Sequence, residues 1–136
     1  MKDQKNNKAI HISLWIAQGL LAIMFLMAGV MKISQPIETL AQSLPWVNTT
    51  PTGLVRFIGL SEFLGGLGII LPSILRIKPF LTIWAAIGLA LVMLFAAIFH
   101  GVRGEFSAIG MNFVLFLLAI FVAWGRHKKS IITAKS

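Results

Sequence analysis

Five polar or charged residues lie within or beside long apolar runs, where an unpaired polar group is costly. They are Lys32, Glu62, His100, Glu105 and Asn112. Glu62 is the sharpest case, because it interrupts the glycine-rich run "GLSEFLGGLG", and an acid at the centre of a membrane helix costs about 2.5–3.5 kcal/mol. Glu62 and His100 are candidates for an acid–base pair, since histidine titrates near neutral pH. The alternative is a structural carboxylate that links Glu62 to Lys32 or His100.

The composition is that of a membrane protein. The chain has 136 residues, of which 57% are hydrophobic and 12% are charged, and its mean hydropathy is +0.88. Such a chain has too little polar surface for a soluble domain, and residues 1–136 are expected to form one membrane domain. The net charge of +8 resides in tails and short loops, so lipid rather than nucleic acid is the expected partner. The absence of cysteine excludes disulfides, thiolate metal sites and a dithiol relay within this chain.

Charge-poor runs predict four membrane-spanning helices, each of about twenty residues, the length that crosses the ~30 Å hydrocarbon core. The predicted spans are residues 12–30, 54–71, 80–99 and 106–124. Between Pro36 and Pro45, apolar residues follow a helical period, which predicts a short interfacial helix in the first outer loop. The fold class is therefore all-α integral membrane, a four-helix bundle with one interfacial helix.

The distribution of lysine and arginine predicts the orientation. Cations gather in the tails 1–11 and 125–136 and in the loop between spans two and three, whereas the other two loops are balanced in charge. By the positive-inside rule, both tails are expected to be cytoplasmic. Trp15, Trp84 and Trp124 lie at the predicted cytoplasmic ends of their spans, as an aromatic belt would place them.

Helical phase predicts where the polar residues face. Gln18, Gly29 and Lys32 share a stripe on span one, and Gly59, Glu62 and Gly66 share one on span two. Small residues in each stripe favour close contacts inside the bundle.

Lys32, Glu62, His100, Glu105 and Asn112 are therefore predicted to line one pocket that opens on the outer side, with Glu62 about 12 Å deep. The opposing interpretations are a snorkelling Lys32, a helix cap at Glu105 and a structural Asn112. Arg56, about 120° from Glu62 on its helix, is expected to snorkel to lipid head groups.

Several segments resemble the DoxX/DoxX-like family of small four-helix bacterial membrane proteins. They are "FLMAGVMKI", "RFIGLSEFLGGLGIILP", "LALVMLFAAIFHGVRGE" and "MNFVLFLLAIFVAWGR", and the resemblance covers roughly residues 12–126. It implies a four-helix bundle in the bacterial inner membrane with a polar site near Lys32, Glu62, His100 and Asn112. Some members of that family are associated with oxidoreductase complexes or thiosulfate:quinone oxidation, and animal relatives act as receptor-assembly chaperones.

Three hypotheses for function follow. The first is an accessory or ligand-binding subunit that holds a small amphipathic molecule, a quinone or a lipid, beside partner redox proteins. The second is a membrane oxidoreductase acting on quinone or sulfur substrates, with Glu62 and His100 as catalytic candidates. The third is an assembly or chaperone protein whose glycine stripe docks other membrane helices. No metal site and no covalently bound cofactor are expected, and the sequence leaves the oligomeric state open.

Overall fold

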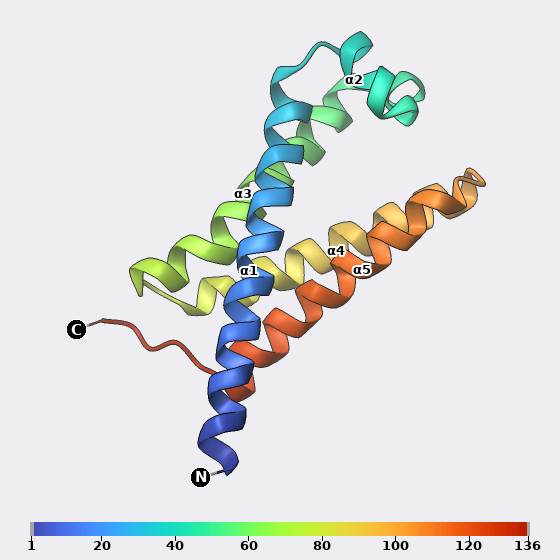
Figure 1. The fold of residues 1–136 in the computed structure, drawn as a ribbon. Coiled ribbons are helices and arrows are strands. Elements are labelled where there is room, and N and C mark those ends of the chain that lie inside the picture. Colours follow the sequence, from blue (N-terminus) through green and yellow to red (C-terminus); the bar gives the residue numbers. More distant parts are fainter. Residues whose placement is uncertain (1, 136) are drawn as a thin grey trace.

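The computed structural model describes residues 2–135, with side chains described from residue 7 onward, and is built of helices (Figure 1). The four long helices are α1 (Lys2–Ser34), α3 (Thr52–Leu75), α4 (Phe80–Val102) and α5 (Phe106–Trp124). The short elements are α2 (Ile37–Ser43), the 3₁₀ helix η1 (Pro45–Thr49) and the π-helical turn η2 (Gly125–Lys129). Each predicted span lies inside one long helix, and the predicted short helix in the first long loop is α2.

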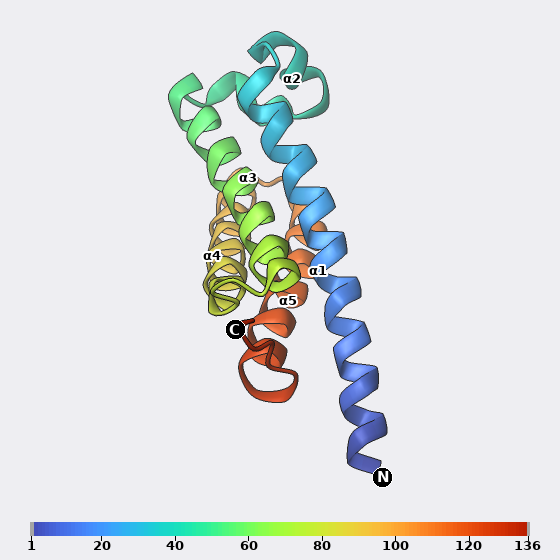
Figure 2. The same cartoon turned by 90° about the vertical axis from the view of Figure 1, so that its left-hand side faces the viewer.

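The long helices form two antiparallel pairs, α1 with α3 and α4 with α5, which are joined through contacts of α3 with α4 and of α1 with α5. Both chain ends and the α3–α4 turn lie at one end of the molecule, here named the terminal end (Figure 1). Residues 35–51 and the α4–α5 turn at 103–105 lie at the opposite end, here named the loop end. The two pairs overlap toward the terminal end and diverge toward the loop end (Figure 1). The N-terminal part of α1 extends beyond the other helices (Figure 2).

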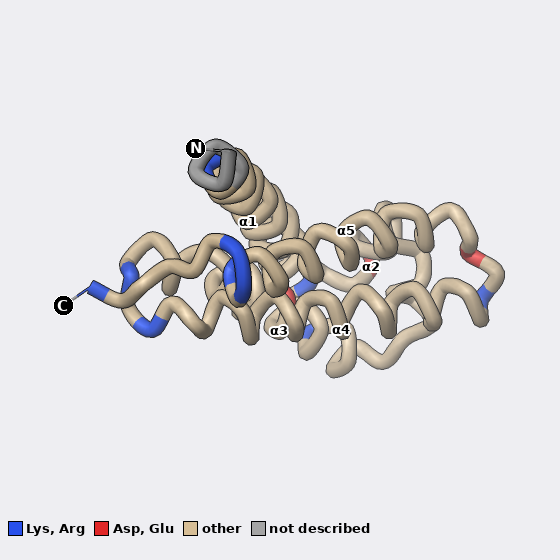
Figure 3. Tube along the Cα trace, turned by 90° about the horizontal axis from the view of Figure 1, so that it is seen from below, with Lys and Arg blue, Asp and Glu red and all other residues tan. Residues whose placement is uncertain are grey.

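Four helices are long and apolar enough to cross a membrane: Asn7–Ser34, Thr52–Leu75, Phe80–Val102 and Phe106–Lys129. Large apolar side chains face outward along them, including Phe57, Phe95 and Phe113. Figure 3 shows long stretches of α4 and α5 without charge between charged residues at their ends. A lipid bilayer is the environment that such a surface requires.

Glycines bring the backbones of α1 and α3 together. A Cβ atom added to Gly29 would lie 2.7 Å from the carbonyl oxygen of Gly59 and 2.7 Å from the nitrogen of Phe63. One added to Gly59 would lie 2.6 Å from Cβ of Lys32. All three distances are too short for a Cβ atom, so glycine is required on both helices. This close contact places Lys32 of α1 directly against α3.

The main apolar core lies where the two helix pairs meet and includes Leu14, Leu21 and Leu89. A smaller, separate core holds the loop end together. Leu40 of α2, Val47 of η1 and Val55 of α3 are fully buried against one another. Trp46 and Met31 pack around them as partly buried neighbours. The loop between α1 and α3 is therefore a folded cover anchored on that helix pair.

Candidate functional site

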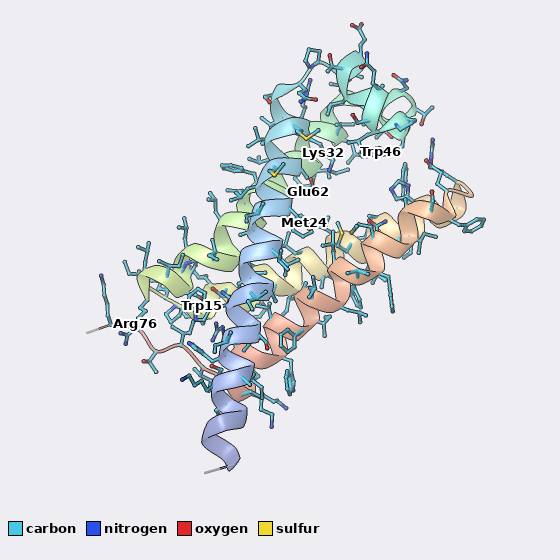
Figure 4. The ribbon with its side chains drawn as sticks, viewed as in Figure 1. Trp15, Met24, Lys32, Trp46, Glu62 and Arg76 are labelled. Carbon is cyan, nitrogen blue, oxygen red and sulfur yellow. The ribbon has the colours of Figure 1, made fainter. Side chains whose placement is uncertain are left out.

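A buried ion pair joins α1 and α3 in the half of the molecule nearer the loop end. Nζ of Lys32 donates to Oε2 of Glu62 at 2.7 Å, and the two side chains are only 10% and 6% exposed. Figure 4 shows the two side chains next to each other between the helices, at the same end as Trp46. The predicted stripes on both helices do face inward, since Gln18, Phe25 and Lys32 of α1 are buried. The expected link from Glu62 to Lys32 is present, and Lys32 does not extend to the surface.

Arg56 differs from its prediction. Its Nη1 donates to the carbonyl oxygens of Lys32 and Gln35, at 2.7 Å each. These carbonyls belong to the last turn of α1 and the residue after it, where the helix leaves acceptors unpaired. The expectation that Arg56 snorkels to lipid head groups is therefore wrong, because a better acceptor set lies on the neighbouring helix. Arg56 fixes the end of α1 that carries Lys32.

His100 and Glu105 meet at the α4–α5 turn. Nδ1 of His100 lies 3.6 Å from Oε1 of Glu105, beyond hydrogen-bond reach. The same carboxylate oxygen accepts a bond from Nε of Arg103. That bond, together with the nearby positive charge, holds the pKa of Glu105 below its usual range. Glu105 occupies the N-cap position of α5, as the cap interpretation expects, but its side chain makes no capping bond and its partner is Arg103.

The cover at the loop end reaches across to this turn. The ring of Trp46 lies edge-on to the rings of Phe99 and His100, with centroids 5.8 and 6.3 Å apart. Nη1 of Arg103 donates to Oγ1 of Thr49 at 2.9 Å. Residues from η1 thus bridge the two diverging helix pairs. The segment that begins on the α1–α3 pair lies over the last turn of α4.

The five predicted site residues therefore fall into two contact groups and one separate residue. Lys32 and Glu62 form the first group and His100 and Glu105 the second, and no hydrogen bond or ion pair joins the groups among the side chains described. Asn112, on α5, is half-buried. Its Nδ2 and the Nδ1 of His100 are buried nitrogens without a hydrogen-bond partner within residues 7–135. Glu62 and His100 make no direct acid–base contact.

A second polar cluster, at the terminal end, was not assigned by the sequence analysis. Nε2 of Gln18 donates to the carbonyl oxygen of Ile69 at 2.7 Å and to Oγ of Ser73 at 3.2 Å. Ser73 in turn shares a hydrogen bond with Thr82 at 2.7 Å. Nε of Arg126 donates to Oε1 of Gln18 at 2.7 Å. Gln18 is thus a buried junction of α1, α3 and η2, and through Ser73 it is linked to α4.

Part of this cluster had a signal in the sequence. Gln18 is a polar residue within the apolar run of span one, near its terminal end, which predicts that its side chain is buried inside the bundle. Arg126 is counted among the tail cations, yet it is only 3% exposed. Several basic residues follow span four, and nothing in the sequence distinguishes Arg126, which is buried, from those that stay exposed.

Two helix pairs with apolar outer faces and small polar clusters buried in an apolar interior define a small four-helix membrane protein. A family model described as the DoxX-like family matches residues 16–122. The chain belongs to this family, and the resemblance expected from its sequence segments is confirmed. No curated protein and no solved structure matches it.

Proposed function

We propose that this chain is an accessory, ligand-binding subunit that holds one small amphipathic molecule, a quinone or a lipid, in the half of the bundle nearer the loop end. The observation that carries the proposal is the buried ion pair of Lys32 and Glu62, combined with unpartnered donors on the facing helix pair. Ionisable groups inside membrane proteins are expensive and occur mainly where they have a task.

The unused hydrogen-bonding capacity indicates the chemistry of the ligand. The ammonium of Lys32 carries three donor hydrogens, and its one side-chain bond in the structure goes to Glu62. Nδ2 of Asn112 is a donor, and Nδ1 of His100 donates in one tautomer. Donors in excess favour a ligand rich in acceptors and without charge, such as the carbonyl oxygens of a quinone or the ester groups of a lipid.

The shape of the loop end favours the same proposal. The helix pairs diverge there (Figure 1), and the segment containing Trp46 crosses from one pair to the other. In the proposed complex, the polar head of the molecule accepts a hydrogen bond from Nζ of Lys32, and its apolar part contacts apolar side chains of the two helix pairs. Its apolar tail would leave between helices into the bilayer, which is the usual form of a site for an amphipathic ligand.

The location belongs to the proposal as well. We infer a bacterial inner membrane, with both termini on the cytoplasmic side, because the basic residues gather at the terminal end. The partner would be a redox complex in the same membrane, to which the chain supplies bound ligand. The chain has no cysteine, so electrons would pass through the bound molecule or the partner.

No specific observation favours either of the two alternative functions, assembly protein or enzyme. The assembly hypothesis requires Gly59 and Gly66 to dock another protein, but both glycines pack against Lys32 and Leu26 of α1. The enzyme hypothesis pairs Glu62 with His100, and these residues belong to different contact groups.

The test uses the full chain purified in a neutral detergent. A benzoquinone with a ten-carbon tail is added, and its retention is measured by native mass spectrometry. Glu62→Gln should reduce retention at least tenfold, whereas Glu38→Gln, the same change at an exposed residue of α2, should retain the wild-type value. Equal retention of the quinone and of co-purified lipid in both variants would refute the proposal.

A further inference from the structure

A cavity at the terminal end, remote from the Lys32–Glu62 pair, has a cationic wall. It has a volume of about 240 Å³ and lies between the start of α4 and the C-terminal segment, residues 131–134. Ser73 and Arg126 supply its polar wall, and Phe80, Ile83, Ile131 and Ile132 supply apolar walls.

The C-terminal segment is held in place as a wall of this cavity. The backbone nitrogen of Lys135 donates to the carbonyl oxygen of Arg76 at 3.0 Å. Nε of Arg76 donates to the carbonyl oxygen of Thr133 at 2.9 Å. These reciprocal bonds tie residues 133–135 to the α3–α4 turn, and Figure 1 shows the chain returning to that turn after α5.

Arg126 is a buried cation without a carboxylate partner among the described side chains. Its Nε donates to Gln18, and its Nη1 lies 3.0 Å from the carbonyl oxygen of Ser130 and 3.0 Å from Nδ1 of His11. Its guanidinium lies 5.0 Å from the ring of Trp15. Its Nη2 is buried and has no hydrogen-bond partner within residues 7–135. The residue is 3% exposed. A buried guanidinium strongly favours an anionic partner that fills its remaining donor positions.

The chain supplies no carboxylate for this role among its described side chains. The sequence has four acidic residues, and the structure describes the side chains of three of them. Glu62 is paired with Lys32 and Glu105 with Arg103, both away from the terminal end, and Glu38 is exposed on α2. The terminal end instead carries Arg76, Lys78, Lys128 and Lys129, which raise the local positive potential and attract anions.

A second cavity adjoins the first on the lipid-facing side. It has a volume of about 450 Å³, and Phe80 and Ile83 line both cavities. The rest of its lining includes Trp84, Ile87 and Trp124. Trp84 is 65% exposed, so this apolar groove opens toward the surroundings of the helices. A cavity with a cationic wall beside an apolar groove matches a molecule with a charged head and an apolar chain.

We propose that the cavity at Arg126 binds the oxyanion head of an anionic amphiphile, a phosphate or carboxylate that carries one acyl chain. The head accepts hydrogen bonds from Nη2 of Arg126 and from Ser73 Oγ. The chain lies in the groove between α4 and α5 beside Trp84. This site is independent of the quinone or lipid proposed near Glu62, because it lies at the opposite end of the bundle.

The test titrates purified full-length protein in a neutral detergent with oleoyl lysophosphatidic acid, followed by native mass spectrometry. Oleoyl lysophosphatidylcholine and inorganic phosphate serve as comparison ligands. Wild type should bind the lysophosphatidic acid at least tenfold more tightly than the choline lipid. Arg126→Gln should weaken that binding at least tenfold, and Arg103→Gln, which removes one positive charge at the loop end, should leave it unchanged.

A second variant protects the test from a folding defect in Arg126→Gln. Ile83→Trp narrows both cavities and leaves every hydrogen bond of Arg126 in place, so it should weaken binding without removing the cation. Unchanged binding in this variant, or equal loss in Arg103→Gln, would overturn the proposal. So would binding of inorganic phosphate as tight as that of the lipid, since the site would then hold a free anion.

Discussion

Replacing Lys32 and Glu62 singly and then together should change the free energy of unfolding in a strongly non-additive way. Each side chain is at least 90% buried, and Nζ and Oε2 lie 2.7 Å apart. Lys32→Met leaves a carboxylate, and Glu62→Met leaves an ammonium, each without its charged partner. Breaking a buried pair in this way costs about 3–5 kcal/mol, because the remaining charge is uncompensated.

The double variant should be far more stable than the sum of the single variants implies. Methionine has a volume and flexibility close to those of the residues it replaces, and an apolar pair in a membrane interior leaves no charge to solvate. We expect the double variant to lie within about 1 kcal/mol of wild type. The coupling free energy of the double-mutant cycle should then be about 5 kcal/mol or more.

The assay is unfolding in mixed micelles with increasing SDS, followed by tryptophan fluorescence and by the chromatographic peak of the folded protein. Glu38→Met, at an exposed residue of α2, is the matched control and should change stability by no more than about 0.5 kcal/mol. Additive single variants, with a coupling below about 0.5 kcal/mol, would show that the pair does not hold α1 against α3.

Three further predictions concern the elements around the pair. Gly59→Ala should destabilise the protein by about 1–3 kcal/mol because its Cβ would meet Lys32, whereas Gly53→Ala, with open space around its Cβ, should be neutral in the same unfolding assay. Arg56→Gln should cost about 1–3 kcal/mol, because two carbonyl oxygens at the end of α1 lose their charged donor. In Glu105→Gln, the melting temperature should fall less between pH 6 and pH 3 than it does in the wild-type protein. The stabilisation from a lowered pKa is fully present above the ordinary value of about 4.3 and is lost as the pH falls through the lowered value.

Each of these has a clear contrary result. Equal stability of the two glycine variants would mean that the backbones of α1 and α3 are not in close contact. Unchanged stability of the Arg56→Gln variant would support the expectation that this side chain faces lipid. An unchanged fall of the melting temperature with pH in Glu105→Gln would mean that Arg103 does not stabilise the ionised carboxylate.

Much of the fold follows from patterns that are local in sequence. Span length and charge placement predict the long helices, and three- and four-residue spacing correctly predicts that Lys32 and Glu62 face the interior. The glycines at 29 and 59 are visible as small residues on the same stripes. Helical phase is thus sufficient to find the buried pair.

The arrangement of the helix pairs does not follow from such patterns. His100 and Asn112 are predicted to lie in the same outer half of the bundle as Glu62, but depth along each helix says nothing about the angle at which two helix pairs cross. Arg56 has the phase of a lipid-facing residue, and only the position of the α1 terminus shows which acceptors it meets. Arg126 is buried because the chain folds back after α5, and this depends on contacts with residues more than one hundred positions away.

The double variant also separates folding from binding. If Lys32→Met/Glu62→Met folds as predicted, a loss of bound molecule in it cannot be attributed to a disordered bundle. Arg126→Gln provides the complementary control, since it alters the terminal end and leaves the Lys32–Glu62 pair intact. The two proposed sites can therefore be tested in the same preparation.

The most direct test of ligand binding near the Lys32–Glu62 pair is chemical extraction of the purified chain, followed by mass analysis of the small molecules that it releases. We expect about one uncharged, carbonyl-bearing amphiphile for each chain in wild type and in Glu38→Gln, and its loss in the folded Lys32→Met/Glu62→Met variant. The same molecules at the same occupancy in all three proteins would contradict this expectation.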